Sequence, residues 1–267
     1  MNVPTINLDP GLTADDYRKI SGPALPPSLV FLSLDRLKEM IEISGDQTFT
    51  EHFLAPDEVK HYTTFHYPKR KIEWLAGRIA AKQAAVYLLT AASHQEAIIA
   101  PKGILIRPDK NGRPYLTLAD KNADQPCPDI SITHSKGLAA AMAVQGSNCG
   151  IDLQQISEAV VRVQDRFASD AEYELIARHL EFSSEKKADG LTLLWSAKEA
   201  LRKGIGGHPL TGFLQMELTD MIEIKPGKMR LDFIVGKEKK IRARTISFFY
   251  NDYGCSLTMV GPRATSS

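Results

Sequence analysis

Apolar residues recur at helical or strand spacing along most of the chain. Between residues 71 and 89 they return every three or four positions, which predicts a long amphipathic helix. Short apolar runs indicate strands, and turn-forming pairs such as Asn111-Gly112 separate them. The strands expected in this first half are 29–34, 103–106, 115–118, 129–133 and 138–144.

The same order of elements returns after residue 147. We expect a strand at 150–153, a helix at 171–180, a long helix at 191–203 and a strand-rich tail from 214 to 260. Each half holds one of the two tryptophans, Trp74 and Trp195, at the start of a long helix. Repeated order indicates an internal duplication, although helix followed by strands also recurs by chance in α+β proteins. Two similar lobes would form a cleft, where small ligands usually bind.

These patterns predict an α+β fold class with four segments. Residues 1–27 form an N-terminal extension that ends in a Gly-, Pro- and Ser-rich connector. Residues 28–147 form the first α+β lobe and 148–261 the second. Residues 262–267 remain as a C-terminal tail.

Composition excludes several classes of protein. The chain has 267 residues, 43% hydrophobic and 24% charged, too apolar for a disordered chain. Its net charge of +1 provides no general attraction to nucleic acid or to a membrane surface. The three cysteines are scattered, and neither a signal peptide nor a long apolar span is apparent. We therefore expect a soluble, cytoplasmic protein without nucleic-acid or membrane partners.

The second long helix has a polar stripe formed by Ser196, Glu199 and Lys203. One interpretation is a solvated face with an ordinary Glu199 to Lys203 pair. The other is that Glu199 faces a cleft as a metal ligand or base, with Lys203 holding an anionic substrate. Spacing alone leaves both open.

The first long helix has a basic stripe of Lys71, Arg78 and Lys82, which is either a phosphate site or a solvated face. Asp152 ends an apolar strand, where a carboxylate is either solvated or held rigidly as a ligand. His134 and Ser135 follow another strand, but the G-x-S-x-G motif of Ser/His hydrolases is absent. A structural histidine is the simpler interpretation there.

Two segments taken together resemble the signature motifs of the phosphopantetheinyl transferase superfamily. They are Gly150-Ile151-Asp152 and the run from Trp195 to Lys203, WSAKEALRK, and every fixed position of both motifs is met. Three further segments resemble the larger, pseudo-dimeric branch of that family, the surfactin-synthetase-activating type. They are NGRPY at 111–115, SITHS at 131–135 and KIEWLAGRIAAK at 71–82.

The resemblance implies two similar α+β lobes in a pseudo-twofold arrangement, with the active site in the cleft between them. It implies transfer of the 4′-phosphopantetheine arm of coenzyme A to a serine of an apo acyl or peptidyl carrier protein. Mg²⁺ is the implied cofactor, coenzyme A the co-substrate and adenosine 3′,5′-bisphosphate the released product. Because one chain supplies both lobes, a monomer is expected.

The resemblance also implies residue roles in the second half. Asp152 and Glu199 would bind Mg²⁺, and Glu199 or a water that it orients would take the serine proton. Lys198 and Lys203 would lie near the coenzyme phosphates. Gln154 stands where many relatives have a third acidic ligand, and a neutral amide is compatible with Mg²⁺, which keeps several waters.

The implied coenzyme contacts in the first half are basic or polar. His134, next to Ser135, would contact a coenzyme phosphate. Arg113 would lie near the nucleotide, and Lys71 and Arg78 near the 3′-phosphate.

Two alternatives remain. A weakened relative would bind coenzyme A or a carrier protein without efficient transfer, and Gln154 is the one feature that favours it. A phosphate- or nucleic-acid-binding module would use the basic stripe without metal. The sequence does not identify the carrier protein, the pathway or the role of residues 1–27.

Overall fold

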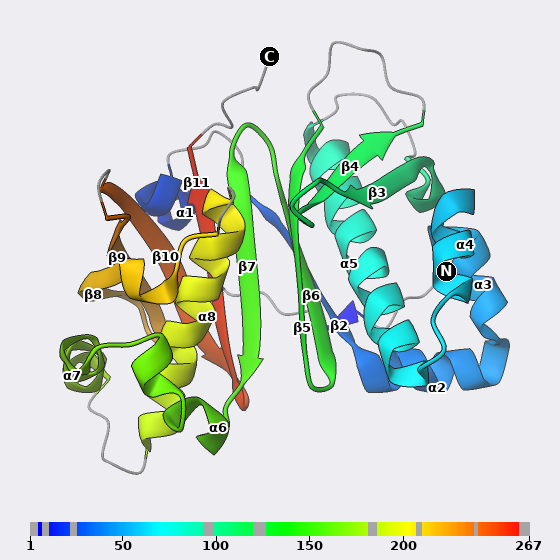
Figure 1. Ribbon diagram of the computed structural model, residues 1–267. Helices are drawn as coiled ribbons and strands as arrows, with labels where there is room; N and C mark the ends of the chain where they lie inside the picture. The colour runs from blue at the N-terminus through cyan, green and yellow to red at the C-terminus, as the bar shows by residue number, and fades with distance from the viewer. Residues whose placement is uncertain are drawn as a thin grey trace. The chain divides into compact units, whose positions relative to one another are not determined.

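The computed structural model describes residues 5–6, 11–21, 26–92, 99–119, 127–180, 186–206, 210–237 and 240–261. These residues form two compact units (Figure 1). The first unit comprises the described residues within 1–12 and 23–147, and the second comprises those within 13–22 and 148–261. The predicted tail at 262–267 and parts of the predicted extension lie outside the described residues.

The first unit has an antiparallel sheet in the order β1-β2-β6-β5, a separate hairpin of β3 and β4, and helices that precede the hairpin in the chain. Its strands are β1 (Thr5–Ile6), β2 (Ser28–Ser33), β3 (Ile104–Pro108), β4 (Pro114–Leu118), β5 (Asp129–Ser135) and β6 (Leu138–Val144). Its helices are α2 (Leu34–Ser44), α3 (Asp46–Phe53), α4 (Pro56–Thr63), α5 (Pro68–Ala92) and the short η1 (Pro101–Gly103).

Small side chains let α5 pack closely on this sheet. Strand β6 has the sequence LAAAMAV and is buried along its whole length, and the inner face of α5 is rich in alanine. At Gly77 of α5, an added Cβ would lie 3.0 Å from Cγ2 of Ile132 on β5. The contact between α5 and the sheet is therefore rich in small residues, whereas larger apolar side chains such as Phe49 and Phe53 fill the neighbouring part of the core.

The second unit has one antiparallel sheet in the order β7-β11-β10-β9-β8. Its strands are β7 (Asn148–Gln155), β8 (Met216–Lys225), β9 (Lys228–Val235), β10 (Ile241–Tyr250) and β11 (Tyr253–Val260). Its helices are α1 (Ala14–Ser21), α6 (Glu158–Val161), α7 (Asp170–His179) and α8 (Lys187–Ile205), with short turns η2 (Gln164–Arg166) and η4 (Phe213–Gln215).

Helix α8 lies against β7 and β11 at backbone contact distance (Figure 1). A Cβ added to Gly150 on β7 would lie 1.9 Å from the carbonyl oxygen of Ala200, closer than any side chain permits. On the helix, a Cβ at Gly204 would lie 2.7 Å from Cγ2 of Thr258 on β11. These two glycines fix the height of α8 above the strand that carries Asp152.

The expected α+β class is confirmed, and the expected strands and long helices are present with bounds shifted by a few residues. Residues within the predicted N-terminal extension take part in both units. Strand β1 pairs with β2, whereas α1 belongs to the second unit, where the buried Asp16 forms an ion pair with Lys225 of β8 at 2.8 Å. No helix among the described residues is long and apolar enough to cross a membrane.

Candidate functional site

Asp152 lies in the middle of β7, on the strand face that meets α8. Side chains of a strand alternate between its two faces, so Gly150, Asp152 and Gln154 share one face. The contact of Gly150 with Ala200 identifies that face as the one turned toward α8. Asp152 is only 7% exposed, which holds its carboxylate beside the helix rather than in bulk water.

Lys203 joins the helix to this carboxylate. Its Nζ donates a hydrogen bond to Oδ1 of Asp152 at 2.7 Å and another to the backbone oxygen of Ile151 at 3.0 Å. Glu199 lies one helical turn before Lys203 and therefore on the same side of α8. Arg202 forms an ion pair with Glu199, with 3.4 Å between Nη1 and Oε1. Two carboxylates and two cations thus meet at one edge of the contact between β7 and α8.

The electrostatics of Glu199 depend on this neighbourhood. Burial raises the pKa of its carboxyl, the negative charge of Asp152 raises it further, and Lys203 and Arg202 partly offset the rise. Lys203, which bonds to Asp152 and lies one turn after Glu199, brings both carboxylates to the same side of the contact between β7 and α8. A raised pKa makes Glu199 a stronger base than an exposed glutamate.

The donor set matches a hard divalent cation. Carboxylate oxygens are the ligands that Mg²⁺ prefers, and Mg²⁺ is usually bound through one or two carboxylates with substrate phosphates and waters completing the octahedron. A buried carboxylate and a half-buried one that repel each other are stabilised by a cation placed between them. Within the described ranges, no group of three or more His, Cys, Asp or Glu side chains could hold a metal ion. Asp152 and Glu199 supply the two carboxylates with which Mg²⁺ shared with phosphate is usually bound.

Gln154 lies two residues beyond Asp152 on the same strand face. Its Nε2 donates to the backbone oxygen of Gln155 at 3.3 Å, so the nitrogen of its amide is engaged by the chain itself. The amide oxygen is the atom that suits a cation. Whether Gln154 contributes a ligand remains a prediction.

Comparison with known proteins places this site in a family. Residues 148–258 match the model of the 4′-phosphopantetheinyl transferase superfamily. The holo-[acyl-carrier-protein] synthase of Bacillus subtilis is 35% identical over 114 residues, 42% of this chain and 90% of that protein. The enzyme of the same name from Sulfurovum sp. is 32% identical over 115 residues, 42% of this chain and 88% of that protein. The chain belongs to the 4′-phosphopantetheinyl transferase superfamily.

Solved structures of similar proteins carry the same name. A holo-(acyl-carrier-protein) synthase from Bacillus anthracis in complex with CoA (3′,5′-ADP) shares 26% identity, with 44% of this chain and 91% of that chain covered and a TM-score of 0.36. The Helicobacter pylori enzyme in complex with coenzyme A shares 24% identity, with 45% and 98% covered and a TM-score of 0.37.

Family membership confirms the expectation of a phosphopantetheinyl transferase. The matched residues, 148–258, all lie in the second unit. The larger, pseudo-dimeric branch therefore stays a prediction that rests on the first-unit segments.

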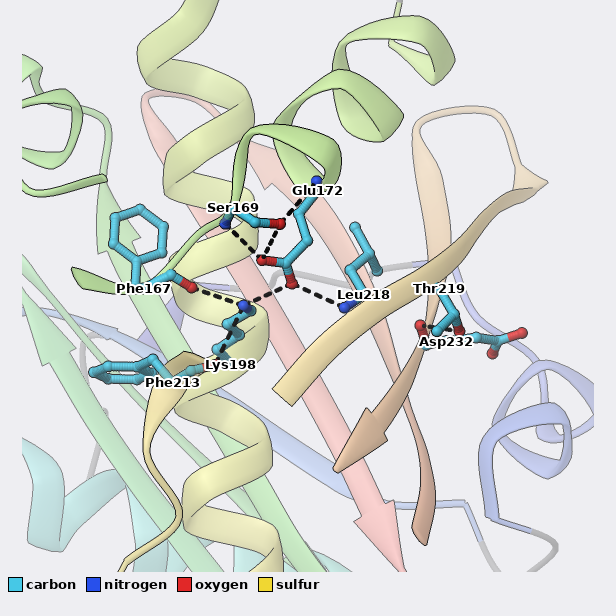
Figure 2. A network of polar contacts seen from close by, with 8 residues as sticks. All are labelled: Phe167, Ser169, Glu172, Lys198, Phe213, Leu218, Thr219 and Asp232. Carbon is cyan, nitrogen blue, oxygen red and sulfur yellow. Dashed lines mark hydrogen bonds and ion pairs between the residues drawn. The ribbon is translucent and has the colours of Figure 1, made fainter. Parts of the chain in front are cut away.

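Lys198 is placed differently from the phosphate contact that the resemblance implies. Its side chain is 0% exposed, and its Nζ contacts Oε1 of Glu172 at 2.7 Å and the backbone oxygens of Phe167 at 2.7 Å and Phe213 at 3.3 Å. All three donors of the ammonium are used inside the unit (Figure 2). The expected contact of Lys198 with coenzyme phosphates is therefore corrected to a structural role.

The residues of the predicted basic stripe on the first long helix differ in how far they are buried. Lys82 is 0% exposed and forms an ion pair with Glu58, so it cannot be part of a surface phosphate site. Arg78 lies over the ring of Trp74, 4.7 Å from its centroid, with its Nε 3.5 Å from Oε1 of Glu58. Lys71 is partly exposed and forms an ion pair with Asp46 at 2.8 Å. Arg78 and Lys71 keep the access that a phosphate contact needs.

Arg78 also lines a pocket of about 480 Å³ in the first unit. The pocket lies among α4, α5 and the β3–β4 hairpin, with His61, Trp74 and Arg107 on its walls. Positive charge beside an aromatic ring suits a nucleotide or phosphate group.

The remaining predicted coenzyme residues lie on or near the sheet of the first unit. Arg113 precedes β4 and forms an ion pair with Asp129 of β5. His134 is exposed and Ser135 half-buried at the end of β5. Their roles as coenzyme contacts stay predictions.

Sequence reasoning missed the partners of the two buried lysines. Glu172 is the third residue of α7 and completes a capping box with Ser169, a pattern that the spacing S-x-x-E signals in the sequence. Glu58 takes the same place in α4, where the cap residue is Ala55 and no such signal exists. Neither glutamate is marked in the sequence as the partner of a distant lysine.

The two buried pairs also correct the register of the internal repeat. Lys198 donates a hydrogen bond to the backbone oxygen of Phe167 and pairs with Glu172. Lys82 donates to the equivalent backbone oxygen of Phe53 at 2.6 Å and pairs with Glu58. Matching the helices on these lysines does not align Trp74 with Trp195, because Trp195 lies three residues before its lysine and Trp74 eight. The tryptophans are therefore not equivalent positions.

Proposed function

We propose that this chain transfers the 4′-phosphopantetheine arm of coenzyme A to a serine hydroxyl of an apo acyl or peptidyl carrier protein, in a Mg²⁺-dependent reaction that releases adenosine 3′,5′-bisphosphate. Family membership and relatives named holo-[acyl-carrier-protein] synthase support the reaction class. The observation that carries the proposal is the convergence of Asp152, Glu199 and Lys203 where α8 meets β7.

The reaction requires neutralised phosphate charge, an aligned nucleophile and an acceptor for one proton. Bound Mg²⁺ would supply charge neutralisation and polarise the pyrophosphate oxygens, with Asp152 and Glu199 as its protein ligands. Lys203, which already neutralises Asp152, is positioned to hold a phosphate oxygen as well.

Glu199 is the proposed base. Its raised pKa favours acceptance of the proton from the serine hydroxyl, directly or through a water. The serine oxygen then bonds to the phosphorus next to the pantetheine arm, and the phosphorus–oxygen bond toward the nucleotide breaks. The bonding electrons leave with adenosine 3′,5′-bisphosphate.

Residues of the first unit are proposed as coenzyme contacts on the family resemblance. The partial access of Arg78 and Lys71 supports them for the 3′-phosphate. Arg113, His134 and Ser135 are proposed for the nucleotide and its phosphates. A monomeric, cytoplasmic protein remains part of the proposal.

The direct test is to incubate the protein with coenzyme A, Mg²⁺ and an apo acyl carrier protein and to weigh the carrier by mass spectrometry. We expect the carrier to gain the mass of one phosphopantetheine group, and the gain to disappear when EDTA removes the metal. A carrier variant with its acceptor serine replaced by alanine is the control.

The same experiment distinguishes the proposed transferase from the alternative that Gln154 favours, a weakened relative that binds without efficient transfer. That alternative predicts coenzyme A binding by calorimetry without a mass change in either acyl or peptidyl carrier proteins. Such a result would overturn the proposed transfer and retain only the binding.

A further inference from the structure

The second unit contains a buried ion pair that the proposed reaction does not use. Glu172 is 5% exposed and Lys198 0%. Glu172 accepts hydrogen bonds from the backbone nitrogen of Leu218 at 2.8 Å and from that of Ser169 at 2.9 Å, besides its contact with Lys198 (Figure 2). Every polar atom of the pair therefore has a partner inside the protein.

Such a pair is poor evidence for stability as such. Removing two charges from water is costly, and apolar residues of similar volume often stabilise a core as well or better. Burial lowers the pKa of the Lys198 ammonium, and the charge of Glu172 opposes that fall. A fully satisfied pair does, however, define one arrangement of the elements that it joins.

The Glu172–Lys198 pair joins α8 to three other segments. Glu172 belongs to the first turn of α7, and its other oxygen contacts reach the cap at Ser169 and strand β8 at Leu218. Lys198 also donates hydrogen bonds to the carbonyl oxygens of Phe167 and Phe213. With the Gly150 contact on the sheet side, these bonds fix the rotation of α8 about its own axis.

Rotation of α8 matters because Glu199 directly follows Lys198. A side-chain oxygen lies about 6 Å from the axis of an α-helix, so a rotation of about 15° displaces it by about 1.5 Å. A displacement of about 1 Å in a reacting group is enough to reduce catalysis strongly. The orientation of the carboxylate of Glu199 toward Asp152 thus depends on how firmly Lys198 is held.

We propose that Glu172, acting through Lys198, is a positioning residue that sets the orientation of Glu199 and with it the geometry of the metal site. The inference rests on the proposed function, since it assigns Glu172 a role in the site of that reaction. Glu172 itself does not touch substrate or metal.

The first unit supplies a matched control. Glu58 and Lys82 form the same kind of buried pair, with hydrogen bonds to Glu58 from the cap nitrogen of Ala55 at 3.0 Å and from Ile106 of β3 at 3.2 Å. The residue after Lys82 is Gln83, which is not a carboxylate. Glu58→Gln therefore removes a buried carboxylate from an equivalent lysine pair without displacing a metal ligand. Because Glu58 also lies 3.5 Å from Arg78, a proposed coenzyme contact, the comparison is made at saturating coenzyme A.

The test compares Glu172→Gln with Glu58→Gln by Mn²⁺ binding in the presence of saturating coenzyme A, measured by electron paramagnetic resonance of free Mn²⁺. We expect Glu172→Gln to weaken Mn²⁺ binding about five- to tenfold, because outer-shell changes at metal sites have effects of about tenfold or more. In the transfer assay, kcat should fall while the KM for coenzyme A stays within about twofold. Glu58→Gln should lower the unfolding temperature similarly but leave Mn²⁺ binding unchanged.

Equal Mn²⁺ affinity in wild type and Glu172→Gln, with only the unfolding temperature reduced, would overturn the positioning role. If Glu172→Gln does not fold, the double variant Glu172→Gln/Lys198→Met removes both charges at similar volume and should fold with the same loss of Mn²⁺ affinity. A double variant with wild-type Mn²⁺ binding would also overturn the role. Failure of the wild type itself to transfer the group or to bind Mn²⁺ would contradict the proposed function instead.

Discussion

The two units share a buried glutamate–lysine pair but differ in the residue that directly follows the lysine. Matching Lys82 with Lys198 makes Gln83 the counterpart of Glu199. Each unit has a comparable antiparallel ladder under its long helix, β2 with β6 in the first and β7 with β11 in the second. The first ladder ends at Ser33 opposite Leu138 and the second at Gln155 opposite Tyr253.

Val30 lies three residues before the ladder end at Ser33, and Asp152 lies three residues before the ladder end at Gln155. Val30 is therefore the counterpart of Asp152. The first unit thus has valine and glutamine where the second has two carboxylates. The shared pair indicates that the scaffold of helix on sheet was retained in both units, whereas the charged site exists in only one. A scaffold of this kind is necessary for the site but does not create it.

The largest expected effect comes from the helix–sheet contact. Gly150→Ala places a Cβ against the carbonyl of Ala200, and neither backbone can move away easily, so we expect a loss of at least about 3 kcal/mol in the free energy of unfolding. Gly77→Ala in the first unit meets one methyl group, Cγ2 of Ile132, at 3.0 Å and gains helix propensity that offsets part of the crowding, so its loss should be much smaller, about 1 kcal/mol. Denaturant unfolding measures both, and equal losses would refute the asymmetry.

Glu199→Gln tests the charged site directly. We expect transfer to slow by at least about a hundredfold, equivalent to about 2.7 kcal/mol, with unchanged circular dichroism, because the variant loses both a base and a metal ligand. The matched change in the first unit, Gln83→Met, should leave the rate within about twofold. Full activity in Glu199→Gln would remove this residue from the mechanism.

Gln154→Glu should increase the difference between the units, because it adds a third carboxylate to the charged site of the second unit. The half-saturating Mg²⁺ concentration for transfer should fall about fivefold, because an anionic ligand replaces a neutral one. Gln155→Glu, one residue along and on the opposite strand face, is the control and should leave the metal titration unchanged. An unchanged titration in Gln154→Glu would mean that position 154 does not reach the metal.

Substitutions of Asp16 and Asp46 should have the smallest effect on the free energy of unfolding, and that effect should depend on pH. Burial tends to raise the pKa of Asp16, but hydrogen bonds from Lys225, Thr13 and Lys19 lower it well below its usual range. A carboxyl with a lowered pKa in the folded state stabilises the protein above its unfolded pKa of about 3.9, and that contribution is lost as the pH falls below this value.

We therefore expect Asp16→Asn to lose about 1 kcal/mol at pH 7 and progressively less below about pH 4. Asp46→Asn is the comparison in the first unit, where the Lys71 hydrogen bond lowers the pKa of a more exposed carboxyl, so its loss should be smaller. Thermal unfolding between pH 3 and 7 measures both. A pH-independent loss in Asp16→Asn would contradict the assignment.

Local patterns in the sequence were sufficient for the α+β class and for both long helices, and the family resemblance of two motifs implied the clustering of Asp152, Glu199 and Lys203. Each of these depends on periodicity or on a motif within a short stretch of chain. The predicted phosphate contact of Lys198 was wrong because the motif around this lysine contains no information about its partners. Glu172 is 26 residues away in the sequence, and the carbonyl oxygens that surround the ammonium belong to other segments. Burial of a charged residue is decided by tertiary packing, and no spacing rule reports it.

The position of helix α1 in the second unit could not be predicted from the sequence either. Nothing in the local sequence of α1 indicates that Asp16 pairs with Lys225 or that the backbone oxygen of Lys19 accepts a hydrogen bond from Arg244 at 3.1 Å. Long-range pairing of this kind depends on the completed sheet of the second unit. The register of the repeat was misread for a related reason, since rare tryptophans stand out in a sequence more than lysines do.

The docking of α1 on the C-terminal sheet has a consequence for biosynthesis. About 200 residues separate Asp16 from Lys225, so a nascent chain growing at about 5–20 residues per second exposes this helix for on the order of 10–40 s before its partner strand leaves the ribosome. A gene fragment that starts at residue 148 would encode every strand of the second sheet and still leave Lys225 without its buried carboxylate.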